Sequence, residues 1–406
     1  MKMRTLGIVG WLLFVLVCLA PETARAVACG TGAGTCFALT GNTNVGTSWS
    51  DTDGGANCNA TCPTGPAAGD ACILTSVSGA LTINAALSCS SFNACAITGT
   101  AAYASTLTHN AAVTLTISGN DAGAPAGGIT FCLSSGMTYT RNNTTTSALA
   151  FTATSGTSTI TANSSGASRN TSNISINGSG GTFELGSALT VNAAATFTHT
   201  VGTFTTNNNA FSMGLWDESG TTARVFNAGS SAITVTATTG SVINFTTSAN
   251  LTFNAGTSTV DVAATATGSR TLAPGGKTFN VFNVTNPTTN SQVVLFATGG
   301  GGGATATNIT FTNTRYISLN GGTTLTVSGT LAFSGGTVAA PLLFISNGNG
   351  AGSLVLSNNT VATNLVIQNI TRSGAGSFTA NDSYDGGNNT SITINPPASG
   401  GRIIGG

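Results

Sequence analysis

One short uncharged motif recurs along this chain and constrains its fold more than any other feature. Leucine and threonine are followed by an apolar residue and a small polar one in five places, namely "LTIN" at Leu81, "LTIS" at Leu115, "LTVN" at Leu189, "LTFN" at Leu251 and "LTVS" at Leu325. Segments such as "AITVTAT" alternate apolar and polar residues, which places every second side chain on the same side of a β-strand. Clusters of Gly, Asn and Ser, which are typical of turns, separate these segments. The pattern predicts many short strands and an all-β chain.

The strands belong to a longer internal repeat. "RVFNAGSSAITV" begins at Arg224, "RTLAPGGKTFNV" at Arg270 and "RYISLNGGTTLTV" at Arg315, and their apolar positions align. Each interval holds two copies of a unit of about 20–25 residues, a period typical of solenoids. Such a unit is too small to bury a core alone, so stacked neighbours must supply it. We therefore predict a parallel β-helix solenoid, right-handed, with the three arginines on one side of the rod and two coils apart.

The low charge of the chain agrees with this stacking. Only 5% of the residues are charged. A charge in one coil would lie beside a like charge at the same position of the next coil, whereas Thr and Asn side chains can form hydrogen-bonded ladders. A string of β-sandwiches would also show alternating strands, but it does not account for the aligned arginine segments.

The first 26 residues have the pattern of a cleaved export signal. Lys2 and Arg4 are followed by an apolar run over 6–20 and by small residues up to Ala26. No second long apolar stretch follows, so we expect no integral membrane protein. Lys277 is the one lysine after the signal, and a nucleic-acid surface needs many cations to displace phosphate counterions. We predict a protein that is secreted or displayed at the cell surface and that does not bind nucleic acid.

The cysteines are confined to the first part of the chain. An even number in an exported chain indicates disulfides, whereas a zinc site needs paired cysteine motifs. The closest spacing, Cys58 to Cys62, stands alone and has no nearby histidine. We predict that pairing stays within 29–132, that it forms a disulfide-rich cap with the first coils over 27–140, and that no cofactor is bound. The eight cysteines of the mature chain are Cys29, Cys36, Cys58, Cys62, Cys72, Cys89, Cys95 and Cys132.

One cysteine pair can be suggested from the period of the repeat. The sequence separation of Cys72 and Cys95 matches one coil of the predicted solenoid, so we expect these two to be bonded. The other pairings are left open, because eight cysteines allow 105 connectivities.

The segment "TSWSDTDGG…CPTGPAAGDACIL" resembles a known opening. Trp49, Pro63, Pro66, Gly69 and Asp70 are similar to the start of G8-type domains and related β-helix surface proteins, which carry a Trp, a Pro-x-x-Gly-Asp turn and then short paired strands. The cysteines are not part of that pattern. The Gly/Thr/Asn-rich remainder resembles the β-helices of secreted bacterial adhesins and autotransporter passengers. These resemblances imply a β-helical surface protein.

Two clusters are candidate ligand sites. Trp216, Asp217 and Glu218 lie together between strands, where an aromatic ring beside acids can stack on a sugar; a loop whose tryptophan covers the core is the favoured interpretation. Asp382 and Asp385 could supply oxygen ligands to a cation such as Ca²⁺, although a capping turn is favoured there.

The distribution of acids bears on catalysis. Parallel β-helices often carry polysaccharide lyases and hydrolases, which need clustered carboxylates, but most acids here are isolated in sequence. We therefore expect a non-enzymatic adhesive or structural surface protein with β-helix repeats over 141–395 and a linker or tail over 396–406. Surface glycans or other cell-surface components are its expected partners. The alternative is a carbohydrate-active enzyme of the β-helix type, which three or more acids converging in one groove would favour.

Overall fold

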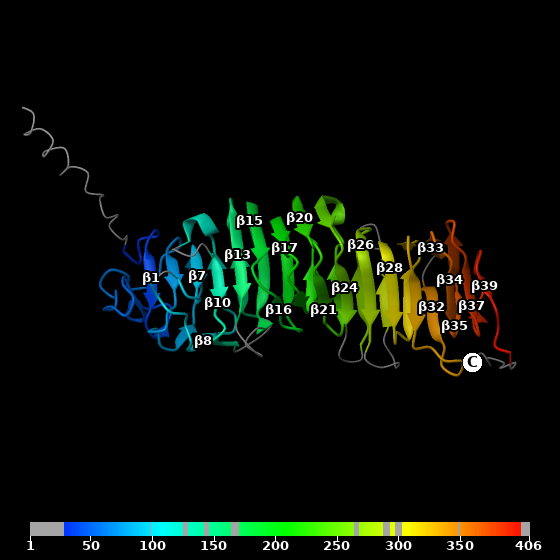
Figure 1. The fold of residues 1–406 in the computed structure, drawn as a ribbon, viewed down its shortest axis with the longest axis horizontal. Helices are drawn as coiled ribbons and strands as arrows, with labels where there is room; N and C mark the ends of the chain where they lie inside the picture. Colours follow the sequence, from blue (N-terminus) through cyan, green and yellow to red (C-terminus); the bar gives the residue numbers. More distant parts are fainter. Residues whose placement is uncertain are drawn as a thin grey trace, which may run out of the picture.

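The computed structural model describes residues 28–97, 99–124, 129–141, 146–163, 170–263, 268–286, 293–296, 303–347 and 350–398. The body is elongated: the chain advances from one end to the other, and the strands lie across the long axis (Figure 1). The predicted signal at 1–26 and the end of the tail at 399–406 lie outside the described residues. The protein is all-β. Within the described part, the only helical segments are short 3-10 turns: η1 (Gly46–Ser48), η2 (Asp121–Gly123) and η4 (Ser248–Asn250).

The named strand pairs are parallel except one, and they run as three long ladders that we call the first, second and third faces. The first face contains β6 (Leu87–Cys89), β9 (Thr114–Ile117), β12 (Ala148–Phe151), the first half of β15 (Asn173–Leu185), the first half of β17 (Thr196–Thr205), β19 (Leu215–Asp217), β22 (Gly240–Asn244), β25 (Arg270–Ala273), β27 (Val293–Phe296), β29 (Tyr316–Asn320), β32 (Leu342–Asn347), β35 (Leu365–Gln368) and β38 (Tyr384–Asp385).

The second face lies beside the first along the first half of the body. Its strands are β1 (Thr35–Ala38), β4 (Ala71–Ile73), β7 (Ser91–Asn93), β10 (Phe131–Leu133), β13 (Thr157–Ala162), the second halves of β15 and β17, β20 (Arg224–Asn227) and β23 (Leu251–Asn254). β3 (Trp49–Ser50) pairs antiparallel with β1 at the N-terminal end.

The third face continues to the far end of the body. Its strands are β14 (Asn170–Thr171), β16 (Leu189–Val191), β18 (Phe211–Met213), β21 (Ala232–Val235), β24 (Thr259–Ala263), β26 (Thr278–Thr285), β28 (Ala304–Thr312) and then β30 (Thr324–Val327), β33 (Gly352–Leu356) and β36 (Ile370–Ser373). β31 (Leu331–Ser334) also pairs with β28. Two smaller parallel sheets contain β2 (Gly41–Asn42), β5 (Leu81–Ile83), β8 (Thr106–His109) and β11 (Thr138–Arg141), and β34 (Thr360–Thr363), β37 (Phe378–Asn381) and β39 (Thr393–Ile394).

Strand alternation separates the core from the surface. On the third face Ile233 pairs with Val260, which pairs with Phe282, and all three side chains are fully buried. The adjacent residues of the same strands, Thr234 and Asn283 among them, point outward and are half-buried. Period-two patterning therefore produces an apolar row inside and a polar row outside, turn after turn.

Turn length changes along the body, and one turn here means the chain between two paired strands. Asn120 bonds to the Ser155 carbonyl, 35 residues away, near the N-terminal end. In the middle, Asn227 bonds to a partner 22 residues away, and near the C-terminal end Leu365 and Ser383 are bonded across 18 residues. A single period of 20–25 residues therefore describes only the middle of the chain.

The predicted alignment of the arginines is wrong for Arg224. Arg224 pairs with Leu251 on the second face, whereas Arg270 pairs with Val294 on the first face. Arg315 immediately precedes β29, which is also on the first face. The similarity of the segments at Arg224 and Arg270 thus reflects a shared strand pattern and not equivalent positions.

Four disulfides confirm that pairing stays within residues 29–132. They join Cys29 to Cys36, Cys58 to Cys62, Cys72 to Cys89, and Cys95 to Cys132. The predicted Cys72–Cys95 bond is wrong. The turn from Cys72 has the assumed length, since Cys72 lies opposite Phe92 on β7, but Cys72 is bonded to Cys89 on β6 of the same turn. Cys95 follows β7, which pairs with β10, and it is bonded to Cys132 on β10. The strand ladders continue across residue 140, since β9 pairs with β12 and β10 with β13.

No helix in the described part of the chain is long and apolar enough to cross a membrane.

Candidate functional site

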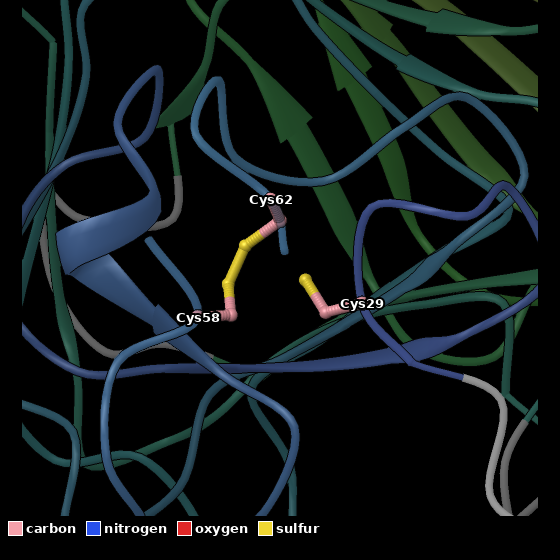
Figure 2. A group of neighbouring side chains, drawn as sticks. All are labelled: Cys29, Cys58 and Cys62. Atoms are coloured by element: carbon pink, nitrogen blue, oxygen red, sulfur yellow. A yellow bond between two sulfur atoms is a disulfide. The ribbon is translucent and has the colours of Figure 1, made fainter. Parts of the chain in front are cut away.

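Two cysteine pairs from separate loops, Cys29–Cys36 and Cys58–Cys62, lie side by side at the N-terminal end. The Sγ atoms of Cys29, Cys58 and Cys62 all lie within 4.8 Å of one another, and all three residues are buried. Figure 2 shows the Cys58–Cys62 disulfide with the sulfur of Cys29 directed toward it. Cys36 is bonded to Cys29 and is fully buried. Sequence spacing did not reveal this cluster, because its two pairs come from separate loops.

Backbone contacts hold the loops of this cluster together. Asp70 is fully buried, and its carboxylate accepts hydrogen bonds from the backbone N–H groups of Gly30 at 2.7 Å, Gly34 at 2.7 Å and Ala67 at 2.8 Å. The backbone N–H of Cys29 donates to Asp51 Oδ1 at 2.6 Å. Asp70 thus fixes the loop between Cys29 and Cys36 through bonds that do not involve sulfur.

Trp49, Gly69 and Asp70, which the sequence pattern singled out, have structural positions in this cap. The Trp49 indole is fully buried and donates to the Thr43 carbonyl at 3.0 Å. Gly69 has φ of 100°, a conformation that favours glycine, and it places the carboxylate of Asp70 under the loops. These contacts explain why that residue pattern suits the end of a β-sheet stack.

The Trp216 cluster lies inside the body. Trp216 and Glu218 are fully buried, so in this structure neither presents a side chain to a ligand in solvent. Glu218 accepts from the Trp216 indole at 3.1 Å and from Arg224 Nε at 3.0 Å, and its carboxylate also meets His199 Nδ1 at 3.2 Å. Trp216 packs in the core, but it does so from the strand β19 and not from the loop between strands that the favoured interpretation predicts.

Asp217 points the other way along the same strand. Its Oδ1 accepts from the backbone N–H of Ser219 and from the Asn244 amide, both at 3.0 Å. The three residues proposed from sequence as one ligand group are therefore divided between the core and the outer surface, as alternation along β19 requires.

The second histidine forms a separate buried network. Tyr139 Oη donates to His109 Nδ1 at 2.7 Å, and His109 Nε2–H donates to the Val113 carbonyl at 3.0 Å, which defines a neutral ring. The pKa of His109 is lowered to about 4, mainly by burial and in part by the charge of Arg141, against the bond to Val113, which raises it. Burial also raises the pKa of Tyr139 to about 12. This network is a neutral core element.

Asp382 and Asp385 are both exposed at the C-terminal end. Asp385 Oδ1 accepts from the Gly387 backbone at 2.8 Å and from the Asn389 amide at 2.6 Å. Asp382 has φ of 47°. The arrangement around Asp385 has the form of a side-chain-bonded turn, as the capping interpretation expects.

Searches of protein-family models, of curated proteins and of solved structures found no match to this chain.

Proposed function

We propose that this chain is a secreted, right-handed parallel β-helix that acts as a non-enzymatic surface protein, binding neutral glycans or building a structural matrix at the cell surface. The observation that carries the proposal is a row of outward-facing groups on the third face. Successive strands there place polar side chains next to one another, and all but one of them are uncharged. They are Thr190, Ser212, Thr234, Asp261, Asn283 and Thr310.

The chemistry of this row suits neutral sugars. Hydroxyl and amide groups donate and accept hydrogen bonds, and parallel pairing repeats them at about 4.8 Å along the body. Asp261 is the one acid in the row, and its neighbours Thr234 and Asn283 are uncharged. A long polar row offers many weak contacts to a polymer, which together give avidity.

The acids in the first half of the chain support a scaffold role. Asp121 Oδ1 accepts from the backbone and hydroxyl of Thr130 and from the backbone of Thr159, so it ties a loop to β13. Asp53 accepts from the Thr75 hydroxyl at 2.6 Å. Together with Asp51 and Asp70, these carboxylates are engaged by the chain itself.

Binding to a glycan array and to isolated cell walls tests the proposal. We expect the mature protein to bind at least one neutral polysaccharide, and the triple variant Thr234→Ala, Asn283→Ala, Thr310→Ala to bind at least tenfold more weakly with an unchanged Tm. The matched control Thr182→Ala, Thr203→Ala, Thr252→Ala changes outward threonines of the second face and should bind normally. No binding, or equal loss in both variants, would contradict the proposal.

A carbohydrate-active enzyme is the second candidate, and one contact favours it. The Thr159 hydroxyl lies 2.6 Å from Asp121 Oδ2 and 3.4 Å from Glu184 Oε1, so two carboxylates approach each other on the second face. Glycoside hydrolysis uses such a pair. Release of reducing ends from a polysaccharide, abolished by Glu184→Gln, would establish this alternative.

A further inference from the structure

Two disulfides at the N-terminal end lie side by side, and the sulfurs of Cys29, Cys58 and Cys62 form one cluster. Cys29 Sγ is within 4.8 Å of both sulfurs of the Cys58–Cys62 pair, while it is bonded to Cys36. Within the described residues, no group of three metal-ligating side chains includes Cys72, Cys89, Cys95 or Cys132. Three sulfurs close enough to share one metal ion therefore occur in this cluster and not at the other two disulfides.

The spacing of these sulfurs is close to that of a zinc site. Zinc binds four ligands tetrahedrally with Zn–S distances of about 2.3 Å, which places neighbouring sulfurs about 3.8 Å apart. The sulfurs of Cys29, Cys58 and Cys62 already lie within 4.8 Å of one another, and the sulfur of Cys36 is bonded to that of Cys29, so short movements would place all four around an ion. Burial of Cys29, Cys58 and Cys62 excludes water, as in closed structural sites.

We propose that Cys29, Cys36, Cys58 and Cys62 bind one Zn²⁺ when their two disulfides are reduced, so that the cap has two alternative crosslinks built from the same four sulfurs. A dithiol supplies two electrons and two protons to each S–S bond and becomes a cyclic disulfide itself, leaving four thiols in the cap. The four thiols then release four protons to solvent as their thiolates bind the ion.

Contacts other than the S–S bonds favour the arrangement of the loops that the metal needs. The Asp70 carboxylate accepts from the backbone N–H groups of Gly30 and Gly34, which both lie in the loop between Cys29 and Cys36. In the other loop, the backbone N–H of Cys62 donates to the Cys58 carbonyl at 2.6 Å. The two loops also touch, since a Cβ on Gly30 would lie 2.6 Å from the Cβ of Cys62. These contacts keep the four thiols together and reduce the entropy that metal binding must offset.

Metal analysis of the full mature chain tests the site. The protein is reduced with a dithiol without oxygen, incubated with Zn²⁺, desalted and compared with the oxidised protein. We expect one zinc per reduced chain and none per oxidised chain. Replacement of zinc by Co²⁺ should give the intense thiolate-to-metal absorption of a sulfur site.

A pair of double variants locates the ion. Cys58→Ser with Cys62→Ser should lower zinc affinity at least 100-fold, whereas Cys95→Ser with Cys132→Ser, the matched control, should keep one zinc per chain. Hydrogen exchange of residues 28–74, measured on each reduced variant, reports the fold of the cap. We expect zinc to restore protection there in the control and not in the first variant.

Three results would overturn the proposal. They are a reduced chain that retains no zinc, equal retention by both double variants, and a reduced cap that stays unprotected in hydrogen exchange with and without zinc. Glycan binding by the oxidised protein is a separate measurement and bears only on the proposed function.

Discussion

The region before residue 141 and the region after residue 146 both consist of stacked strands, but different interactions stabilise the stack in each. The first has the longest turns and all four disulfides, whereas the second has shorter turns and a core with many contacting aromatic rings. Phe226 illustrates the second region: its ring lies 4.9 Å from Trp216, 5.3 Å from Phe204 and 5.7 Å from Phe253.

The difference follows from what each region can bury. An end of a sheet stack lacks one neighbour, so its core is half formed and crosslinks that restrict the unfolded chain compensate. A turn in the middle has neighbours on both sides, and stacked rings add dispersion and burial along the whole body. Covalent bonds therefore occur where packing alone is least sufficient.

Reduction of the disulfides should give the largest effect and separate the two regions. Each bond contributes about 2–4 kcal/mol to the free energy of unfolding, so loss of all four in the presence of a chelator should open the cap. We expect hydrogen exchange to accelerate over 28–141 while residues 196–263 keep their protection. Simultaneous loss of protection in both regions would show that the body unfolds as one unit and would break the comparison.

Phe226→Ala should give the next largest effect, in the opposite region. Removing a fully buried ring from the aromatic core lowers the free energy of unfolding by about 3–5 kcal/mol. Denaturant unfolding followed by tryptophan fluorescence measures the change, since Trp216 contacts this ring. Val225→Ala is the control on the outward side of β20, where we expect less than about 1 kcal/mol; a comparable loss in the control would argue against a packing origin.

The pH dependence of stability should show a smaller effect in the first region. The folded-state pKa of His109 is lowered from 6.5 to about 4, so the unfolded chain binds more protons between these values. The free energy of unfolding should therefore rise with pH from about 4 to 6.5, by at most about 3 kcal/mol from this residue. In His109→Gln this rise should flatten, as measured by thermal unfolding across the window. An identical pH profile in the variant would mean that other groups cause the dependence.

Much of the fold could be predicted from the sequence, because strand alternation is a local property. The all-β class, parallel pairing and the confinement of disulfides to residues 29–132 follow from residue types and their spacing. The polar ladders were also predictable: the Asn254 amide donates to Asn227 Oδ1 at 2.7 Å, and Asn227 donates to Thr205 Oγ1 at 3.1 Å.

The candidate sites were less predictable for a physical reason. Trp216 and Glu218 are next to Asp217 in sequence, but alternation places these two on the core side and Asp217 on the other. The order of apolar and polar residues does not predict a carboxylate such as Glu218 on the core side. Glu218 is stabilised there by Arg224 and His199, which come from other strands. Sequence proximity alone suggested a shared surface that the alternation of β19 does not allow.

What the sequence by itself determined is which side of each strand faces inward, since this depends only on the order of apolar and polar residues. What only the tertiary structure decided is which turns lie side by side: that Arg224 and Arg270 belong to different faces, that Cys72 meets Cys89, and that Cys29 meets Cys58 and Cys62. Neighbour identity depends on the length of every intervening loop, and those lengths vary along the chain from 18 to 35 residues per turn and beyond. A fixed sequence period does not predict these loop lengths, because a loop of almost any length can return the chain to the edge of the next strand.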